Sequence, residues 1–174
     1  MQARVDLNDA RTLVALQHLA TLGPQGARSV MHRISRYMLS SMQRRFNAQE
    51  GPDGKSWEPS DRARSEGGQT LRDTGRLLRS LTWRYGADYA EAGTNVPYGA
   101  AHQFGVHKMI NIRAHRRTRR KTSKTGRVSL SSWTVRSYPR LMLLPARPFA
   151  GFSRTDEERI VQLLREGIAR LTAK

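Results

Sequence analysis

Hydrophobic residues recur with a helical period in the first third of the chain. From Val30 to Phe46 they fall at offsets of 0, 4, 7, 8, 12 and 16, so they form one stripe along a helix. This spacing predicts a helix over roughly 25–47. Methionine and aromatic side chains on such a stripe favour core packing over a ligand site.

The two ends of the chain are also predicted to be helical. Asn8 or Asp9 can cap a first helix, which the Gly-Pro pair at 23–24 ends. Near the C-terminus, a capping box at 155–158 starts a last helix over about 156–172. The apolar face of that last helix is made of Ile160, Leu163, Leu164, Ile168 and Leu171.

The middle of the chain changes to a strand period. Leu81, Trp83 and Tyr85 alternate with polar residues, and after a turn at 86–88 the segment YAEAGT can return as a second strand. Short helices are predicted on either side. They cover about 75–81, capped by Asp73 or Thr74, and about 97–104, opened by Pro97 and stopped by Gly105.

A second alternating region carries a basic segment. Apolar residues at 110–114 lead outward from the body, and apolar residues at 128–135 can return. The tip between them, HRRTRRKTSKTGR, is predicted to be irregular and disordered. Residues 107–140 are therefore predicted to be a basic arm inserted in the body, either a long β-hairpin or a loop.

Together these elements predict an α+β fold with a single domain over residues 1–174. It is a small antiparallel sheet packed by long helices, with a protruding basic β-hairpin arm or loop. Its predicted parts are N-terminal helices at 1–47, a long aperiodic loop at 48–70, and a sheet made of 81–94 with the strands flanking the arm, packed by the helices at 25–47 and 156–172.

Composition narrows the setting. The 174 residues include no cysteine, which excludes disulfides and cysteine-based zinc sites. No apolar run is long enough to span a bilayer, and the N-terminal segment lacks the apolar core of a signal peptide. We therefore expect a protein that is made in a cytoplasm and does not contact a membrane.

The net charge of +17 belongs to one region. Between Gly93 and Thr155 there are thirteen Lys or Arg and no Asp or Glu, whereas the rest of the chain is nearly balanced, with 18 bases against 14 acids. Such a block predicts a polyanion or an acidic protein surface as its neighbour. The alternative is a solvated loop without a partner.

No residue pattern indicates catalysis. The histidines include no His-Glu-x-x-His pair, there is no Gly-x-Ser-x-Gly elbow, and GPDGKS lacks the spacing of a phosphate-binding loop. We therefore predict a protein that is not an enzyme and has no cofactor or metal. A basic nucleic-acid-binding protein without catalytic activity remains an alternative function, although no known nucleic-acid-binding signature is visible.

Several segments, in this order and spacing, resemble the phage virion morphogenesis family, the tail-completion or neck proteins of Mu-like and P2-like phages. The matching segments are EGPDGKSWEP at 50–59, DTGRLLRSL at 73–81, GTNVPY at 93–98, HQFG at 102–105 and PARPF at 145–149, followed by Gly151. The match covers about 46–170, and it is poorest over 107–140, which resembles a variable insertion.

This resemblance implies a structural protein of the head–tail junction, acting as a neck, tail-completion or tail-terminator component. It implies association with the virion, after assembly in the host cytoplasm. The partners that it implies are other copies of the chain in a ring and the adjoining head-connector and tail-tube proteins. The resemblance does not extend to the role of the arm, whose charge alone makes a non-specific contact with DNA a further possible partner interaction. A ring subunit needs two different side faces, because head-to-tail contacts close a ring.

Two sets of residues are candidates for assembly contacts. The first set is aromatic, proline-bearing or fixed by neighbouring prolines, and comprises Trp57, Pro59, Tyr98, His102, Phe104, Arg147 and Phe149. Of these, Trp57 is expected to be an interface anchor that the subunit fold does not need, and Arg147 a fixed guanidinium with several donor contacts. The second set is the basic arm, Arg116, Arg117, Arg119, Arg120, Lys121, Lys124 and Arg127. The segments 98–105 and 144–152 are expected to lie side by side, with the arm emerging between them.

Overall fold

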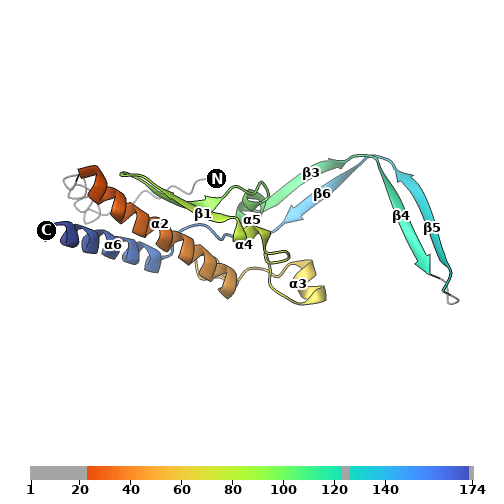
Figure 1. Cartoon of the computed structure of the whole chain (residues 1–174). Helices are drawn as coiled ribbons and strands as arrows, with labels where there is room; N and C mark the ends of the chain where they lie inside the picture. Colours follow the sequence, from red (N-terminus) through yellow and green to blue (C-terminus); the bar gives the residue numbers. More distant parts are fainter. Residues whose placement is uncertain (1–22, 123–125, 173–174) are drawn as a thin grey trace.

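The computed structural model describes residues 23–122 and 126–172, and the first helix expected after Asn8 lies outside this part. The described part combines helices with antiparallel strand pairs, so the predicted α+β class is confirmed (Figure 1). The elements are α2 Gly23–Ala48, α3 Asp61–Glu66, α4 Arg76–Arg79, β1 Leu81–Tyr85, β2 Ala90–Thr94, α5 Gly99–Phe104, β3 Val106–Ile112, β4 His115–Thr122, β5 Val128–Val135, β6 Tyr138–Leu144 and α6 Arg154–Thr172.

The long helix α2 runs along the body, as its apolar stripe predicts. It begins at Gly23, so the Gly-Pro pair opens this helix, whereas the earlier helix that the pair was expected to end lies outside the described residues. Proline suits the first turn, because its missing N–H would have no intrahelical partner there. Its buried stripe runs from Ala27 to Phe46.

Helix α6 packs along α2 in a first apolar cluster. The cluster joins Ala27, Val30, Met31 and Ile34 of α2 to Ile160, Leu163 and Leu164 of α6. The two helices approach closely at Gly167, where a Cβ atom would lie 2.4 Å from a methyl carbon of Val30. The cap of α6 is shifted from the predicted Thr155, since the helix begins at Arg154 and Ser153 exchanges hydrogen bonds with Asp156.

The pair β1–β2 covers another part of α2. The strands are antiparallel, as predicted, and the register places Leu81 opposite Thr94 and Tyr85 opposite Ala90. A second apolar cluster lies where this pair, α2 and the loops meet. Its buried members are Met42, Phe46, Trp57, Leu77, Leu81, Val96 and Phe149.

The predicted loop over 48–70 is only partly irregular. It contains the six-residue helix α3, whose N-cap Ser60 accepts a hydrogen bond from the backbone N–H of Ala63. The hydrophobic pattern does not predict α3, because this helix buries none of its side chains. Such an element is stabilised by its capping and side-chain hydrogen bonds, since it has no apolar face to bury.

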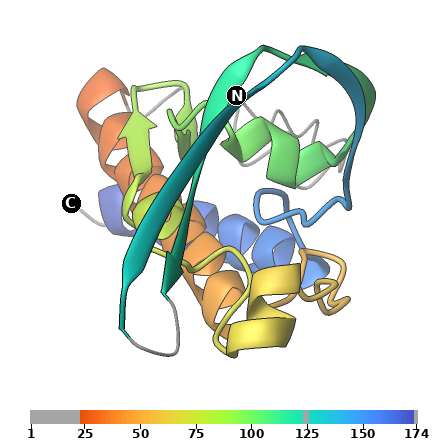
Figure 2. The ribbon, with the colours of Figure 1, turned by 90° about the vertical axis from the view of Figure 1, so that its right-hand side faces the viewer.

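The region 106–144, which we call the hairpin, projects from the body as two successive strand pairs (Figure 1). Its proximal ribbon, β3 with β6, pairs Val106 with Leu144 and Ile112 with Tyr138. Its distal ribbon, β4 with β5, pairs His115 with Val135 and Thr122 with Val128. Seen from the hairpin side, the ribbon arches in front of the body (Figure 2).

The hairpin corrects three expectations. The apolar residues at 110–112 pair with 138–140 and not with 128–135, because the ladder is longer than the apolar alternation indicates. The basic segment 115–122 is strand β4 and not an irregular tip. The strand pairs of the hairpin also form sheets separate from β1–β2 and do not extend it.

Candidate assembly surfaces

The two segments at the root of the hairpin lie side by side. The backbone N–H of Arg147 donates to the carbonyl oxygen of His102 at 2.7 Å. The amide of Gln103 accepts from the backbone N–H groups of Phe149 and Ala150, both at 3.0 Å, and donates to the carbonyl oxygen of Ala150 at 2.7 Å. Gln103, which lies in the HQFG segment but was not among the candidate residues, therefore ties the chain that leaves the body at 102–105 to the chain that returns at 144–152.

Trp57 and Phe149 belong to the core. Trp57 is 6% exposed, meets Phe46 edge to face, and donates its indole N–H to the carbonyl oxygen of Pro148 at 2.9 Å. Phe149 is 1% exposed and also packs on Phe46. The expectation that Trp57 is an interface anchor separate from the fold is therefore wrong, because its loop folds back and buries the indole in the body.

Arg147 is held in place as predicted, but by fewer contacts. It is 3% exposed, and its Nε donates to the carbonyl oxygen of Glu58 at 2.7 Å. Burial lowers the pKa of its guanidinium, an effect that the nearby charge of Glu58 opposes. The adjacent Pro59 is exposed. Arg147 thus joins the Trp57 loop to the root of the hairpin.

The remaining root candidates differ in exposure. Phe104 is 69% exposed at the end of α5, whereas Tyr98 is less exposed and meets the ring of His102 edge to face. The Nδ1 atom of His102 is buried and has no hydrogen-bond partner. Burial, followed by the positive charge of Arg147, lowers the pKa of His102. Phe104 is therefore the root residue most available to a neighbour.

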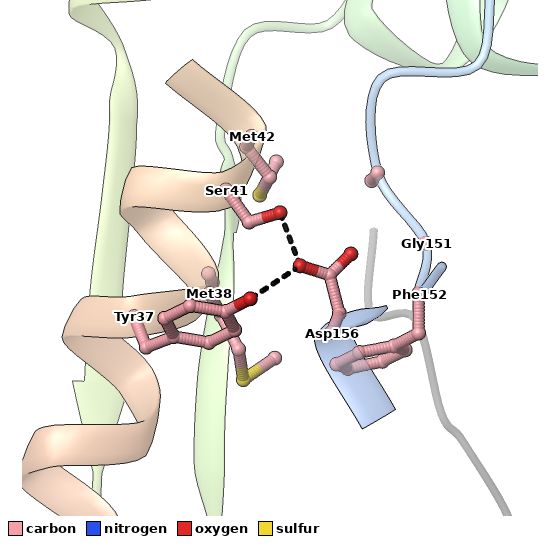
Figure 3. A pocket seen from close by; sticks show the side chains of 9 residues that line it. Tyr37, Met38, Ser41, Met42, Gly151, Phe152 and Asp156 are labelled. Carbon is pink, nitrogen blue, oxygen red and sulfur yellow. Dashed lines mark hydrogen bonds between the residues drawn. The ribbon is translucent and has the colours of Figure 1, made fainter. Parts of the chain in front are cut away.

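A buried ionic cluster links α2, the returning chain at 149–151 and α6. Figure 3 shows the part in which the carboxylate of Asp156 faces the hydroxyls of Ser41 and Tyr37. The carboxylate of Asp156 pairs with the guanidinium of Arg45 and accepts from the hydroxyls of Ser41 at 2.5 Å and Tyr37 at 2.9 Å. Arg45 also donates to the carbonyl oxygens of Phe149 and Gly151. Both terminal nitrogens of Arg45 and both carboxylate oxygens of Asp156 have partners, so the arrangement is structural. Neither Arg45 nor Asp156 stood out as buried in the sequence, although Arg45 lies three residues after Met42 on the apolar stripe.

The proximal ribbon presents an uncovered apolar face. Residues directly opposite in an antiparallel pair point to the same side, so Met109 lies beside Leu141, and His107 lies beside Leu143. Met109 is 62% exposed and Leu143 is 64% exposed. We call Met109, Leu141 and Leu143 the apolar face. Monomeric proteins rarely leave such side chains together in water, so the apolar face is a candidate interface.

The distal ribbon carries most of the predicted basic residues. Arg116, Arg117, Arg119, Arg120 and Lys121 lie on β4, Arg127 precedes β5, and Lys124 lies outside the described residues. All five bases on β4 are exposed. Their arrangement on a regular strand fixes which of them share a face.

Two kinds of site were sought in the described ranges 23–122 and 126–172. They contain no group of three or more His, Cys, Asp or Glu side chains that could hold a metal ion. Within the same ranges, no helix is both long and apolar enough to cross a membrane.

Comparison with known proteins identifies the family. The model of the phage virion morphogenesis family matches residues 7–169, and the chain belongs to this family. Protein G of Escherichia phage Mu, named as a capsid assembly protein, is 30% identical over 178 residues, covering 97% of this chain and 94% of that protein. Mu-like prophage FluMu G protein 2 of Haemophilus influenzae is 28% identical over 159 residues, covering 91% and 90%. No solved structure matches the chain.

The resemblance stated from the sequence motifs is thus confirmed. Membership of the family gives the chain a structural or assembly role in a phage and associates it with the virion. The relation to Mu-like proteins extends over nearly the whole chain, the hairpin included.

Proposed function

We propose that this protein is a ring-forming structural subunit of the phage head–tail junction, acting in neck formation, tail completion or tail termination, without catalysis. The observation that carries the proposal is the apolar face of the proximal ribbon. It lies on a projecting element, and its side chains are left exposed by the described part of the subunit. Membership of the virion morphogenesis family supports a role in particle assembly.

The apolar face is large enough to contribute substantially to an interface. Full burial of a Leu or Met side chain stabilises an association by about 1.5–3 kcal/mol. Met109, Leu141 and Leu143 are each exposed by 45% or more, and Phe104 lies just before the ribbon. Their joint burial offsets a large part of the roughly 4–15 kcal/mol lost in translational and rotational freedom when two proteins associate.

The shape of the subunit favours a head-to-tail contact. The hairpin leaves one end of an elongated body, whereas α2 and α6 occupy the other end (Figure 1). A hairpin that docks on the body of the next copy forms an interface from two different surfaces. Repetition of such an interface closes a ring when the rotation between copies fits. The same ring would then present its two rims to head-connector and tail-tube proteins.

The test is the assembly state of the full-length protein with and without the apolar face. We expect Met109→Ser/Leu143→Ser to remain folded by circular dichroism and to lose ring particles in sedimentation and electron microscopy. The control is Val128→Ser/Leu130→Ser on the distal ribbon, which removes two exposed apolar side chains and should still form rings.

The same variants can be tested in infected cells. The apolar-face variant should accumulate unjoined heads and tails and lower the yield of infectious particles, whereas the control should not. A wild-type protein that stays monomeric with heads, tails and their extracts would contradict the proposal. So would an apolar-face variant that assembles at the normal yield.

A further inference from the structure

The distal ribbon is basic on both of its faces. Side chains alternate along β4, so Arg117, Arg119 and Lys121 point to one side and Arg116 and Arg120 point to the other. Each residue shares its side with its partner on β5. Arg117 lies beside Trp133, Arg120 beside Leu130, and Arg119 beside Ser131. A ribbon built to lie on one flat surface would carry its charges on one face only.

Nothing acidic within this region neutralises these charges. The sequence has no Asp or Glu between Gly93 and Thr155. Within the described residues, none of the five bases on β4 has a carboxylate within ion-pair distance. Arg116 donates to the hydroxyl of Ser132, and the Nε of Arg117 donates to the ring of His115. Five cations on one eight-residue strand repel one another, so their arrangement favours a polyanionic ligand.

Three features favour double-stranded DNA over an acidic protein surface. First, the major groove of B-DNA admits a two-stranded β-ribbon, and it offers a row of phosphates on each wall to the two basic faces. Second, β5 places hydroxyl side chains among the Arg and Lys side chains of β4, at Ser129, Ser131, Ser132 and Thr134. Such hydroxyls donate to phosphate oxygens. Third, the ribbon projects away from the described part of the body (Figure 1).

We propose that the distal ribbon is a DNA-binding element that inserts into the major groove of duplex DNA and contacts phosphates through Arg116, Arg117, Arg119, Arg120 and Lys121. Binding is independent of base sequence, because the proposed contacts are to phosphates, which carry no sequence information directly. The arginines act through the backbone on both walls. This inference does not rest on the proposed ring, and each is tested by its own measurement.

The length and charge of the ribbon set the expected salt dependence. Eight residues of strand extend about 26 Å, which matches roughly 15 phosphate charges along a duplex. Five phosphate contacts predict a slope of log K against log salt of about −4.5. Affinity should therefore fall by about 500-fold between 50 and 200 mM monovalent salt.

The experiment measures binding of the full-length protein to a 30-base-pair duplex by fluorescence anisotropy across this range of salt. The test variant replaces the five Arg and Lys residues of β4 by Gln, which keeps the side chains long and polar. We expect it to lose at least 100-fold in affinity at 50 mM salt and most of the slope. The matched control replaces five exposed bases of the body, Arg36, Arg76, Arg84, Arg165 and Arg170, by Gln.

The control has the same net charge as the test variant, so a general effect of charge would weaken both equally. Equal weakening, or wild-type binding with a slope shallower than −2, would overturn the proposal. Competition separates the two sources of negative charge. If single-stranded DNA of equal length, or polyglutamate, competes as well as the duplex, the ribbon does not require a groove. It would then bind an acidic surface and not the major groove. Ring formation by the Gln variant, measured in parallel, should be unchanged.

Discussion

The carboxylate of Asp156, in the first turn of α6, is buried against the guanidinium of Arg45 on α2. Both side chains are about 95% removed from solvent. The two helices therefore meet through apolar side chains, through the partly exposed pair Arg33–Glu166, and through this buried ion pair at one end. A buried pair of this kind is costly to break, because removal of one partner leaves the other charge without compensation.

Stability should depend on acid through Asp156. Burial, the largest influence, opposes ionisation, but hydrogen bonds from Ser41, Ser153 and Tyr37 outweigh it and lower the pKa from 3.8 to about 2. Because the folded pKa lies below the unfolded pKa, this stabilisation is complete above about pH 4 and is lost as the pH falls toward 2. It amounts to about 2 kcal/mol. Urea unfolding at several pH values measures it.

Replacement of the carboxylate isolates the same contribution. We expect Asp156→Asn to lower the free energy of unfolding at pH 7 by about 3–5 kcal/mol, since Arg45 is left buried without its counter-charge. The matched control is Asp88→Asn, which changes an exposed carboxylate and should cost under about 0.5 kcal/mol. An Asp156→Asn protein with wild-type stability would show that the ion pair contributes nothing net.

Trp57 should be essential to the subunit itself. We expect Trp57→Ala to destabilise the protein by about 3–5 kcal/mol, because it opens a cavity beside Phe46 and leaves the carbonyl oxygen of Pro148 without its donor. Trp57→Phe should cost less, since it retains most of the apolar volume. The control is Trp133→Ala on the distal ribbon, where the indole is half exposed. Unfolding measured by circular dichroism should be nearly unchanged for that control.

Gly105 should be required at the root of the hairpin. Its φ is +73°, and a Cβ atom would lie 2.8 Å from the carbonyl oxygen of Leu144 and 2.9 Å from the nitrogen of Ala146. Both are backbone atoms that cannot rotate away. Gly54 offers a matched control, because its φ is +75° but open space surrounds it.

Gly54→Ala should cost only the backbone strain, about 1–2 kcal/mol. Gly105→Ala should cost more than this, and it should also make the hairpin easier to cleave in limited proteolysis. Equal losses of stability at the two positions would show that the close approach at the hairpin root does not constrain the fold.

Gln103 should stabilise the position of the chain that returns to the body at 149–150, through its hydrogen bonds. Gln103→Glu replaces the donor that faces the carbonyl oxygen of Ala150 by a second acceptor. We expect a loss of about 1–3 kcal/mol, as for a hydrogen bond left unmade where water has only partial access. Gln103→Met keeps the volume and removes all three hydrogen bonds, so it should cost at least as much. Urea denaturation of both variants tests this order.

The elements with a strong period were predictable from the sequence. The stripe from Val30 to Phe46 specifies α2, and the alternation from Leu81 to Tyr85 specifies β1, since each pattern reflects burial on one side. The helix α3 has no buried face, so only its cap Ser60 marks it. The hydrophobic pattern therefore predicts best those elements that bury the most apolar side chains.

The pairing of the hairpin and the destination of buried polar groups were not predictable in the same way. The register that places Ile110 opposite Arg140 depends on the whole length of the ladder. Trp57, Arg45 and Asp156 each find their partners about 90 residues or more away in the chain. Such contacts follow from the assembled fold, and local spacing carries no record of them.

The root of the hairpin has one further consequence. Val106 and Leu144 are paired neighbours, and the hydrogen bonds of His102 and Gln103 fasten the two crossing segments below them. These contacts at the root thus join the two segments of the body independently of the rest of the ribbon. A short turn in place of 107–143 should leave the body intact, and lengthening adds only a small entropic cost, roughly 0.6 kcal/mol for each doubling of a flexible loop. The length of the ribbon can therefore change while the body stays the same, so the reach of the hairpin and the fold of the subunit can vary independently.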